Sequence, residues 1–550
     1  MFLGIDVGGT FTDAVVVSDG RIIASAKSPT THEDLLGGIF RSLDTVLTGL
    51  TGTVRRVSLS TTIVTNNLVE GRTEPVGLIL IPGPGLDIVP LLPARALVID
   101  GYIDHRGREI AAVDVSSLHR IFSSFSDHDT FAVSGKFAVR NPKLETKISQ
   151  EILKQPRVCH VTAASAISGS LNFLRRTNSA YFNAAVWKRF NRFATAVEGA
   201  LAARAITAPV YILKADGGTM PLSVARNQPV EAIFTGPAAS VLGIMAAERP
   251  QGDTISLDIG GTTTDIAMWR GGLPLMAVQG AFVGSYPTAV RSFLLQSVGI
   301  GGDSFVRRQD GRIIVGPERK GPPQSFGGLH PTVTDALVVA GRIDCGNLEA
   351  AIGAMGKLAL PDQSPGAVAA EVLTVAVGTI TAAVKSLIER QQSQPVYTVD
   401  NMINAASFLP QSVVSVGGTA AGLAPLVAER LGVSCQVPPE APVANALGAA
   451  VACATTEITV RIDTEQEVVT AAELGLQGKL ESKRISLPEA RAMTAKYLAD
   501  RAAKAGITFA EAETVYEEEF NLVRGFRTTG KIMTCRQQVK PGVSCYAREG

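Results

Sequence analysis

Cysteine and histidine are both scarce in this chain, and neither is arranged as a metal site requires. Six cysteines and six histidines are spread over 550 residues. No two cysteines form a Cys-x-x-Cys pair, which disfavours an iron–sulfur cluster or a cysteine-rich zinc site and predicts reduced, mostly buried thiols. No histidine lies at zinc-ligand spacing from another histidine or an acid. No Gly-x-Ser-x-Gly segment supports Ser-His-Asp hydrolysis.

An excess of charge and a long apolar run are missing as well. The 51 basic and 50 acidic residues leave a net charge of +1, so there is no electrostatic case for nucleic acid or an anionic membrane as partner. We expect no segment apolar and long enough to span a bilayer. The chain opens directly on a strand-like run without a basic, cleavable leader, which predicts a cytoplasmic protein.

What the chain does have is one motif twice. Asp6–Asp13 reads Asp-Val-Gly-Gly-Thr-Phe-Thr-Asp and Asp258–Asp265 reads Asp-Ile-Gly-Gly-Thr-Thr-Thr-Asp, identical at six of eight positions. Each copy lies between two strand-like runs. Glycine lets the backbone approach phosphate oxygens, and the N–H groups and threonine hydroxyls can bind them. The candidate phosphate-binding residues are Gly8, Gly9, Thr10, Thr12, Gly260, Gly261, Thr262 and Thr263. The alternative is a pair of tight turns in which Asp and Thr cap the local backbone.

Two further glycine-rich segments could complete a nucleotide site. In Ser415–Gly422, a strand is followed by Gly417-Gly418 and then by a helix, so bare backbone could admit a base or ribose. Gly301 and Gly302, within Gly299–Ser304, could touch phosphate or ribose. The alternative for the first is a tight connection between strand and helix.

Two polar segments are candidates for binding a substrate. Ser60–Asn67 contains Thr61, Thr62, Asn66 and Asn67, whose hydroxyls and amides could orient a small amide or carbonyl compound. The alternative is a helix N-cap, which explains one or two of these residues.

The second segment, Lys214–Thr219, follows a buried strand. Its Lys could reach a phosphate, and Asp216, beside Gly217, could act as a base or metal ligand. The alternative is a solvated turn with a surface lysine.

The order of strands and helices predicts an α/β protein built from a duplicated unit. The two motif copies stand about 250 residues apart, each continuing into a hairpin. A long helix is expected from about 177 to 205, an exposed hairpin at Asp310-Gly311, and a charged, polar α+β region after about 455. We therefore divide the chain into residues 1–175, 176–455 and 456–550.

Taken in order, these motifs resemble the two-lobed ATPases of the actin, heat-shock-chaperone and sugar-kinase superfamily, and more narrowly the hydantoinase A and 5-oxoprolinase family. The resemblance covers about residues 1–455. It implies two ribonuclease-H-like lobes around a nucleotide cleft, followed by a small C-terminal α+β domain. The segments that carry it are Gly4–Asp13, Ser60–Asn67, Arg176–Asn183, Asp216–Gly218, Thr235–Ala238, Asp258–Asp265, Gly299–Gly302 and Val333–Ala336.

The resemblance implies an ATP-dependent hydrolase that opens a small cyclic amide, such as a hydantoin, 5-oxoproline or a related lactam, by phosphorylating its carbonyl oxygen. ATP and Mg²⁺ would be bound, with Asp6 and Asp258 holding the metal or its waters. Asp13 and Asp265, which close the two motifs, complete the candidate catalytic set. A hydantoinase-B-like partner subunit and a homo-oligomer are also implied.

The chain departs from the family pattern at two places. It reads Pro323–Gly328 where relatives have an Ala-Cys-Tyr-Gly stretch, and Ala421–Ala424 where they have Gly-Pro-Leu-His. A Cys and a His that serve metal or substrate in relatives are therefore replaced. Two other functions stay open: a small-molecule kinase of the same superfamily, and a nucleotide-dependent scaffold without a small substrate.

Overall fold

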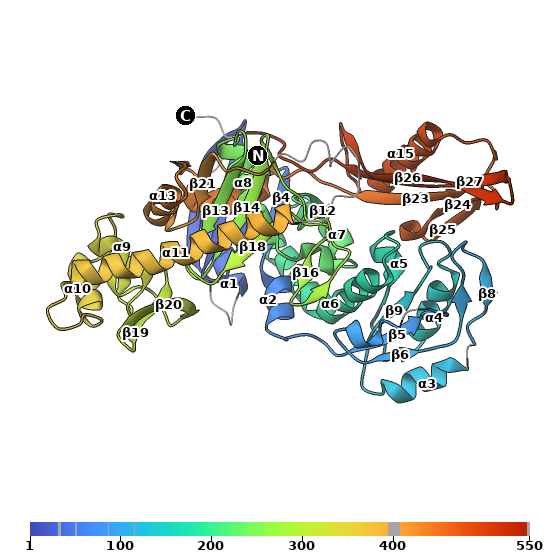
Figure 1. Cartoon of the computed structure of the whole chain (residues 1–550), viewed down its shortest axis with the longest axis horizontal. Coiled ribbons are helices and arrows are strands. Elements are labelled where there is room, and N and C mark those ends of the chain that lie inside the picture. The colour runs from blue at the N-terminus through green and yellow to red at the C-terminus, as the bar shows by residue number, and fades with distance from the viewer. Residues whose placement is uncertain (31–34, 50–51, 86, 115, 394–406, 547–550) are drawn as a thin grey trace.

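The computed structural model describes residues 1–30, 35–49, 52–85, 87–114, 116–393 and 407–546 (Figure 1). The first sheet has the strand order β12-β11-β4-β1-β2-β3. β2 runs antiparallel to both β1 and β3, and β4 and β11 run parallel to β1. The strands are β1 (Phe2–Val7), β2 (Phe11–Ser18), β3 (Arg21–Pro29), β4 (Arg56–Thr61), β11 (Val210–Leu213) and β12 (Thr219–Pro221).

The second sheet repeats this plan. Its order is β15-β14-β13-β21-β22, with β18 also paired to β14. The register repeats too, because Asp6 lies opposite Asp13 in the first sheet and Asp258 opposite Asp265 in the second. The lobe is therefore duplicated, as the twin motif predicts. The strands are β13 (Thr254–Ile259), β14 (Thr264–Arg270), β15 (Leu273–Pro274), β18 (Leu295–Val298), β21 (Ser412–Val416) and β22 (Ser434–Gln436).

Two helices, α8 (Thr235–Ala247) and α14 (Ala444–Val451), pack against strands of the sheets and against each other. Glycine makes the contact possible. A Cβ on Gly243 would lie 2.1 Å from the Ala444 carbonyl oxygen, and one on Gly4 in β1 would lie 2.1 Å from the Ala446 carbonyl oxygen. The two helices and β1 therefore meet backbone to backbone, which fixes the lobes relative to each other.

A separate parallel sheet, β10-β9-β5-β6, is inserted between β4 and β11. Its two central strands, β5 and β9, are buried along their whole length because both faces are covered. The predicted division at residue 175 falls just inside the long helix α6, and β11 and β12, which follow it, complete the sheet of the first lobe. The elements are β5 (Val76–Ile81), β6 (Ala96–Val98), β9 (Thr130–Gly135), β10 (His160–Ala163), α3 (Ser117–Ser124), α4 (Lys143–Leu153), α5 (Ala164–Ile167) and α6 (Phe173–Ala202).

The second lobe carries an outgrowth at the left of Figure 1. It contains the predicted hairpin at Asp310-Gly311 and the 28-residue helix α11. By length and composition α11 could cross a membrane, so the expectation that no segment has this character is wrong. Its apolar face instead packs into the core of the second lobe. The elements are β19 (Ser304–Gln309), β20 (Arg312–Arg319), α9 (Val333–Val339), α10 (Leu348–Gly356), α11 (Pro365–Gln392) and α13 (Ala420–Leu431).

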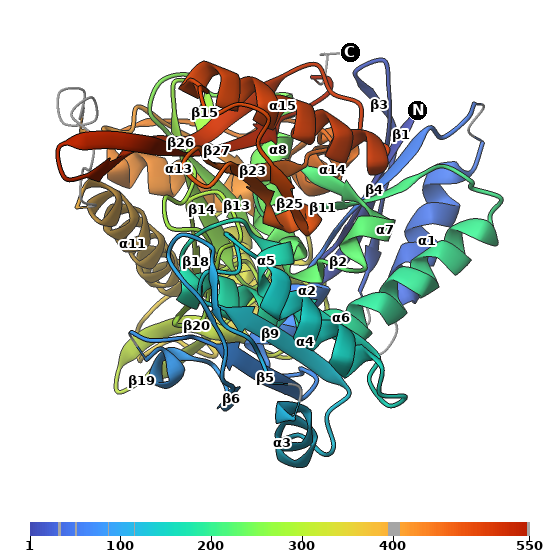
Figure 2. The same ribbon diagram turned by 90° about the vertical axis from the view of Figure 1, so that its right-hand side faces the viewer.

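The C-terminal part forms a five-stranded antiparallel sheet, β25-β24-β23-β27-β26, covered by one long helix (Figure 2). It contacts the inserted domain through Arg106, which binds both oxygens of Asp463. The elements are β23 (Glu457–Asp463), β24 (Val468–Ala471), β25 (Leu476–Lys479), α15 (Leu487–Lys504), β26 (Ala512–Arg524) and β27 (Arg527–Val539).

The six cysteines are all free, as their spacing predicts. The prediction that most are buried is wrong. Only Cys535 is buried, on β27, while Cys159 and Cys345 are exposed and the other three are half-buried. Burial raises the pKa of each thiol, which favours the unreactive protonated form.

Candidate active site

The turns of the two motifs, Asp6–Phe11 and Asp258–Thr263, are here called the twin turns. They are built alike and face each other. The Gly8 N–H donates to the Phe11 carbonyl at 3.0 Å, and the Gly260 N–H donates to the Thr263 carbonyl at the same distance. A Cβ added to Gly261 would lie 3.5 Å from the Thr10 hydroxyl of the other lobe. The sequence predicted these glycines and threonines as one site, and the structure brings Thr10 and Gly261 together.

Asp6, which is buried, and Asp258, which is half-buried, are the first carboxylates of the twin turns. Asp258 accepts hydrogen bonds from the Ser240 hydroxyl and, at 3.1 Å, from the Asn445 amide. Asp6 Oδ1 is buried without a hydrogen-bond partner among the described residues. Burial raises the pKa of both carboxyl groups, that of Asp6 to about 7, with repulsion from Asp13 and Asp258 contributing to the shift of Asp6.

Asp13 and Asp265 lie opposite these residues on the neighbouring strands. Asp13 forms an ion pair with Lys27 at 2.7 Å, yet burial still raises its pKa. Asp265 accepts a hydrogen bond from Ser297, and burial raises its pKa to about 7. Four carboxyl groups with raised pKa values thus line one pair of turns, and such groups gather at functional sites.

A divalent cation fits this arrangement. Within the described part of the chain, no three His, Cys, Asp or Glu side chains converge as a protein-only metal site. Mg²⁺ commonly takes only one or two carboxylates and completes its shell with water and phosphate oxygens. The unpartnered Oδ1 of Asp6 is the kind of oxygen that such an ion would bind.

The two later glycine-rich segments border the second turn. Gly302 and Asp303 donate backbone N–H groups to the Gly260 and Gly261 carbonyls at 2.9 and 2.7 Å. Gly301 packs on the same turn, where a Cβ would lie 2.6 Å from the Gly260 oxygen. Gly301 therefore supports the turn and leaves no room for a ligand beside its own Cα.

Gly417 and Gly418 differ in role. Gly417 has a φ of +102°, and a Cβ there would lie 2.7 Å from Asp258 Oδ1. Gly418 has no atom within 4 Å of where its Cβ would be, and only Thr419 separates it from α13. Gly417 is needed for close approach to the carboxylate, whereas Gly418 leaves open space beside the site.

Thr12 is not brought to the site. It lies opposite Val7, one residue out of step with the Asp6–Asp13 pair, so it points to the other face of the sheet. There it is buried, and its hydroxyl lies 2.9 Å from the Thr30 hydroxyl. Thr263, in the second turn, is exposed.

The predicted substrate residues of Ser60–Asn67 border the first turn. They form a pocket of about 70 Å³ together with Gly8 and Gly9; its lining includes Thr61, Thr62, Asn66, Asn67, Glu70 and Arg72. Thr62 makes no side-chain capping bond to α2 (Ile63–Val69). Its hydroxyl instead donates to the Val7 carbonyl at 3.3 Å and accepts from the Asn66 amide at 3.2 Å.

Asp216 and Gly217 lie elsewhere. Asp216 is buried, pairs with Lys214 at 3.2 Å, and accepts a hydrogen bond at 2.6 Å from Gln538 of the C-terminal domain. Lys214 is buried too, so the turn is not the solvated alternative. A Cβ on Gly217 would lie 2.4 Å from the Phe293 ring. Asp216 and Gly217 therefore contact the C-terminal domain and the Phe293 ring, and they do not border the pocket beside the first turn.

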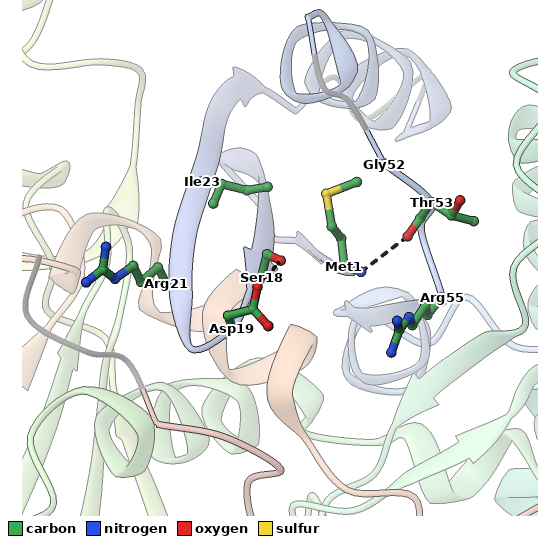
Figure 3. A pocket seen from close by; sticks show the side chains of 8 residues that line it. All are labelled: Met1, Ser18, Asp19, Arg21, Ile23, Gly52, Thr53 and Arg55. Atoms are coloured by element: carbon green, nitrogen blue, oxygen red, sulfur yellow. Dashed lines mark hydrogen bonds between the residues drawn. The ribbon is translucent and has the colours of Figure 1, made fainter.

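Sequence reasoning missed several contributors. Ser240, Asn445 and Lys27 all contact the carboxylates, and Glu70 and Arg72 line the small pocket as an ion pair at 3.0 Å. Only Ser240 had a signal, because it lies two residues after the Thr235–Ala238 segment. A second pocket, of about 660 Å³, lies at the opposite end of β1 from Asp6, around Met1 and the β2–β3 turn (Figure 3), and none of the predicted site residues lines it.

The two lobes have matching strand orders, and each presents one of the twin turns to the other. This arrangement is the two-lobed actin-like ATPase fold. The nucleotide-free acetone carboxylase structure shares the fold, with a TM-score of 0.73 at 16% identity over 99% of this chain and 88% of that one. The ATP-dependent caprolactamase of Pseudomonas jessenii gives 0.67 at 20% identity, over 98% and 87%.

This chain belongs to the hydantoinase/oxoprolinase family. The family model matches residues 176–458, and the model for the N-terminal region matches residues 2–155. Caprolactamase subunit alpha of Pseudomonas jessenii is 27% identical over 63% of this chain and 55% of its own length. The acetophenone carboxylase gamma subunit of Aromatoleum aromaticum is 25% identical over 62% and 53%. The chain spans about half the length of these relatives.

Proposed function

We propose that this chain is an ATP-dependent enzyme that opens a small cyclic amide, a hydantoin, 5-oxoproline or a related lactam, by phosphorylating the amide carbonyl oxygen. The observation that carries the proposal is the pocket beside the first turn, which joins Gly8 and Gly9 to the hydroxyls and amides of Thr62, Asn66 and Asn67. A compound bound there would lie next to a phosphate-binding turn. The caprolactamase and carboxylase relatives add support from similarity.

The twin turns would hold the triphosphate between the lobes. Backbone N–H groups and the Thr10 and Thr262 hydroxyls would bind the phosphates, and Gly418 would leave room for the nucleoside. Asp6 and Asp258 would hold Mg²⁺ directly or through its waters. Bound magnesium supplies neutralisation of the charge on the transferring phosphoryl group. The buried carboxyl groups would ionise when the cation binds, since it offsets the burial that raises their pKa values.

The pocket beside the first turn, here called the amide pocket, would orient the substrate. A lactam presents one carbonyl acceptor and one N–H donor, and the Asn66 and Asn67 amides together with the Thr62 hydroxyl can match both. Leaving one of these half-buried groups unpaired once a bound ring covers it would cost about 1–3 kcal/mol, which is enough to select a lactam over an apolar ring. The pocket would turn the carbonyl oxygen toward the γ-phosphate.

The bond changes balance for this reaction. The amide oxygen forms a bond to the γ-phosphorus while the bond to the β-phosphate oxygen breaks, which releases ADP. Water then adds to the activated carbon, the ring C–N bond breaks, and inorganic phosphate leaves. The products are the open-chain amino acid or ureido acid, ADP and phosphate.

We also propose that this chain is cytoplasmic and that it assembles both with copies of itself and with a hydantoinase-B-like subunit. The support is that two of the relatives are named as the alpha and gamma subunits of larger enzymes. Addition of a purified second subunit to this chain should raise ring opening without changing ATP affinity.

Asp258→Asn tests the nucleotide half of the proposal. We expect ATP turnover to fall by about 100-fold or more, because the metal loses a charged ligand, while the thermal unfolding profile stays close to that of the parent. Asp310→Asn, the same change in an exposed hairpin turn, is the control. Parent-level ATP hydrolysis by Asp258→Asn would show that the assignment is wrong.

Asn66→Ala tests the substrate half. ATPase activity is measured with hydantoins, 5-oxoproline and larger lactams, together with product analysis. We expect the variant to keep basal ATP binding and to lose stimulation by the cyclic amide that stimulates the parent. If it only melts at a lower temperature and keeps the stimulation, the cluster is structural. A phosphorylated product without ring opening would identify a kinase instead.

A further inference from the structure

A pocket of about 790 Å³ lies where the inserted domain, the second lobe and the C-terminal sheet meet. Its walls come from the inserted domain around Arg140, from the start of α6, from the segments around Met276–Gly280 and Arg291 before β18, and from β23, β26 and β27 of the C-terminal sheet. None of the residues of the twin turns or of the amide pocket lines it. Five arginines line it against two glutamates, Glu473 and Glu518: Arg140, Arg175, Arg291, Arg461 and Arg536.

No carboxylate among the described residues makes a hydrogen bond to the arginines of this arginine pocket, although Glu518 and Asp463 lie close enough to attract Arg140 and Arg461. Arg175 donates to the Thr288 carbonyl and the Gln279 side chain, and Arg536 donates to the Thr459 hydroxyl at 3.2 Å, so neutral oxygens hold both. The carboxylate oxygens of Glu457 and Glu513 lie 3.9 and 4.0 Å from Arg291.

Two of the arginines also have buried donors without an acceptor. Arg461 is only 8% exposed, and its Nη2 has no hydrogen-bond partner among the described residues. Nε of Arg140 also has no hydrogen-bond partner there. Burial lowers the pKa of Arg461 to about 10; the nearby Arg140 and Arg106 add to the shift, and Asp463 and Glu518 partly oppose it. A buried guanidinium without an acceptor is costly, and an oxyanion would relieve that cost.

The two glutamates do not meet this demand. Glu473 gives one oxygen to the Thr459 N–H at 2.9 Å, and burial raises its pKa, which weakens its negative charge. Glu518 accepts a hydrogen bond from Tyr516. Neither makes a hydrogen bond to Arg461 or Arg140 in the described structure.

We infer that the arginine pocket binds a small organic oxyanion, a carboxylate or phosphate compound, outside the nucleotide site. The planar fork of arginine matches both groups with paired hydrogen bonds. The volume is that of a small-molecule site, and Leu171, Met276 and Val515 offer apolar contact for a carbon skeleton. Because three domains supply the walls, the anion would also hold the C-terminal sheet against the rest of the protein. This site does not depend on ring opening.

The test is calorimetric titration of the full chain with glutarate and with inorganic phosphate at constant ionic strength, with glutaramide as the neutral counterpart of glutarate. We expect at least one anion to bind, glutarate more tightly than glutaramide if the group is a carboxylate, and phosphate if it is a phosphate. Arg140→Gln and Arg461→Gln should weaken that binding at least tenfold. Arg312→Gln, the same change at an exposed position, should not.

The outcomes separate clearly. Arg461→Gln removes a buried group and could unfold the domain, whereas Arg140 is less buried, so Arg140→Gln keeps the test decisive. Loss of anion binding in Arg140→Gln with unchanged Mg-ATP binding supports the arginine pocket, whatever the fate of the proposed ring opening. Absence of binding by both anions, or binding unchanged in Arg140→Gln, overturns it.

Discussion

Among single residues, Asp6 combines burial, nearby carboxylates and an unpartnered oxygen. Its pKa is about 7 in the folded protein against an ordinary value of 3.8. Between these values the folded chain holds a proton that the unfolded chain has released. The free energy of unfolding therefore falls as pH rises from about 4 to about 7. Mg²⁺ should reverse part of this loss at neutral pH by stabilising the ionised carboxylate.

Asp6→Asn should reduce this pH dependence. The amide does not ionise, so without metal the variant should gain melting temperature over the parent at pH 8, by a few degrees, and gain little at pH 4. Asp13, Asp258 and Asp265 keep their raised pKa values, so some dependence stays. Melting curves in EDTA at both pH values measure it. An equal offset at pH 4 and pH 8 would contradict a raised pKa at Asp6.

The sequence predicted the carboxylates of the site but not the groups that surround them. Asp6 and Asp258 stand out because the motif is repeated. Lys27, Ser240 and Asn445 reach these carboxylates or their neighbours only through the fold. Thr12 was assigned to the site because motif membership does not tell which face of the strand a residue occupies.

Among the elements, the connection from β21 to α13 contains two adjacent glycines with different surroundings: Gly417 is crowded and Gly418 is open. Gly418→Val should fold normally, since its Cβ meets no atom within 4 Å, and should weaken ATP binding at least tenfold, about 1.4 kcal/mol, by a clash with the nucleoside. Calorimetry with Mg-ATP measures the effect.

Gly353→Val is the matched control, because Gly353 in α10 is equally open and lies away from the twin turns. Unchanged ATP affinity in Gly418→Val together with lost stimulation by the cyclic amide would move the substrate to this connection.

Elements with strong local signals were predicted well. The long helix expected at 177–205 is α6, and the hairpin at Asp310-Gly311 is present. The prediction that no segment is apolar and long enough to span a membrane failed at α11. Its apolar residues face the core of a large lobe, which gives the helix a composition like that of a membrane segment.

For the whole molecule, the only ion pairs that we find between the inserted and C-terminal domains in the described residues centre on Arg106, and hydrogen bonds from Gln466 and Thr470 to the Arg106 and Arg140 carbonyls add to the contact. Arg106 binds Asp463 at 2.8 Å, with side chains 13% and 2% exposed, and also reaches Glu465. Arg106→Ala should cost less than the about 3–5 kcal/mol typical of an unpaired buried charge, because the Glu465 and Gln466 N–H groups and the Gln466 amide still donate to Asp463. Limited proteolysis should then release the C-terminal domain first.

Arg491→Ala serves as the control, since Arg491 pairs with Glu517 on the surface of the same domain and exposed pairs contribute at most about 1 kcal/mol. Equal proteolysis rates in the two variants would show that the buried pair does not hold the domains together.

The sequence could not predict how the first lobe is assembled. The pairing of β4 with β11 joins Leu59 to Ile212, and no local pattern reports a contact across so many residues. The inserted sheet looked like a continuation of the first lobe for the same reason.

This discontinuity has a consequence for synthesis on the ribosome. The strands of the inserted sheet are neighbours in sequence, and the sheet can form once α6, whose Ala180 and Ala184 complete its core, has emerged, while β4 still has an unpaired edge. That edge, with the buried side chains of Val57 and Leu59, must wait until β11 has left the exit tunnel before the first sheet can close. The nascent chain therefore completes its inserted domain before the lobe that surrounds it.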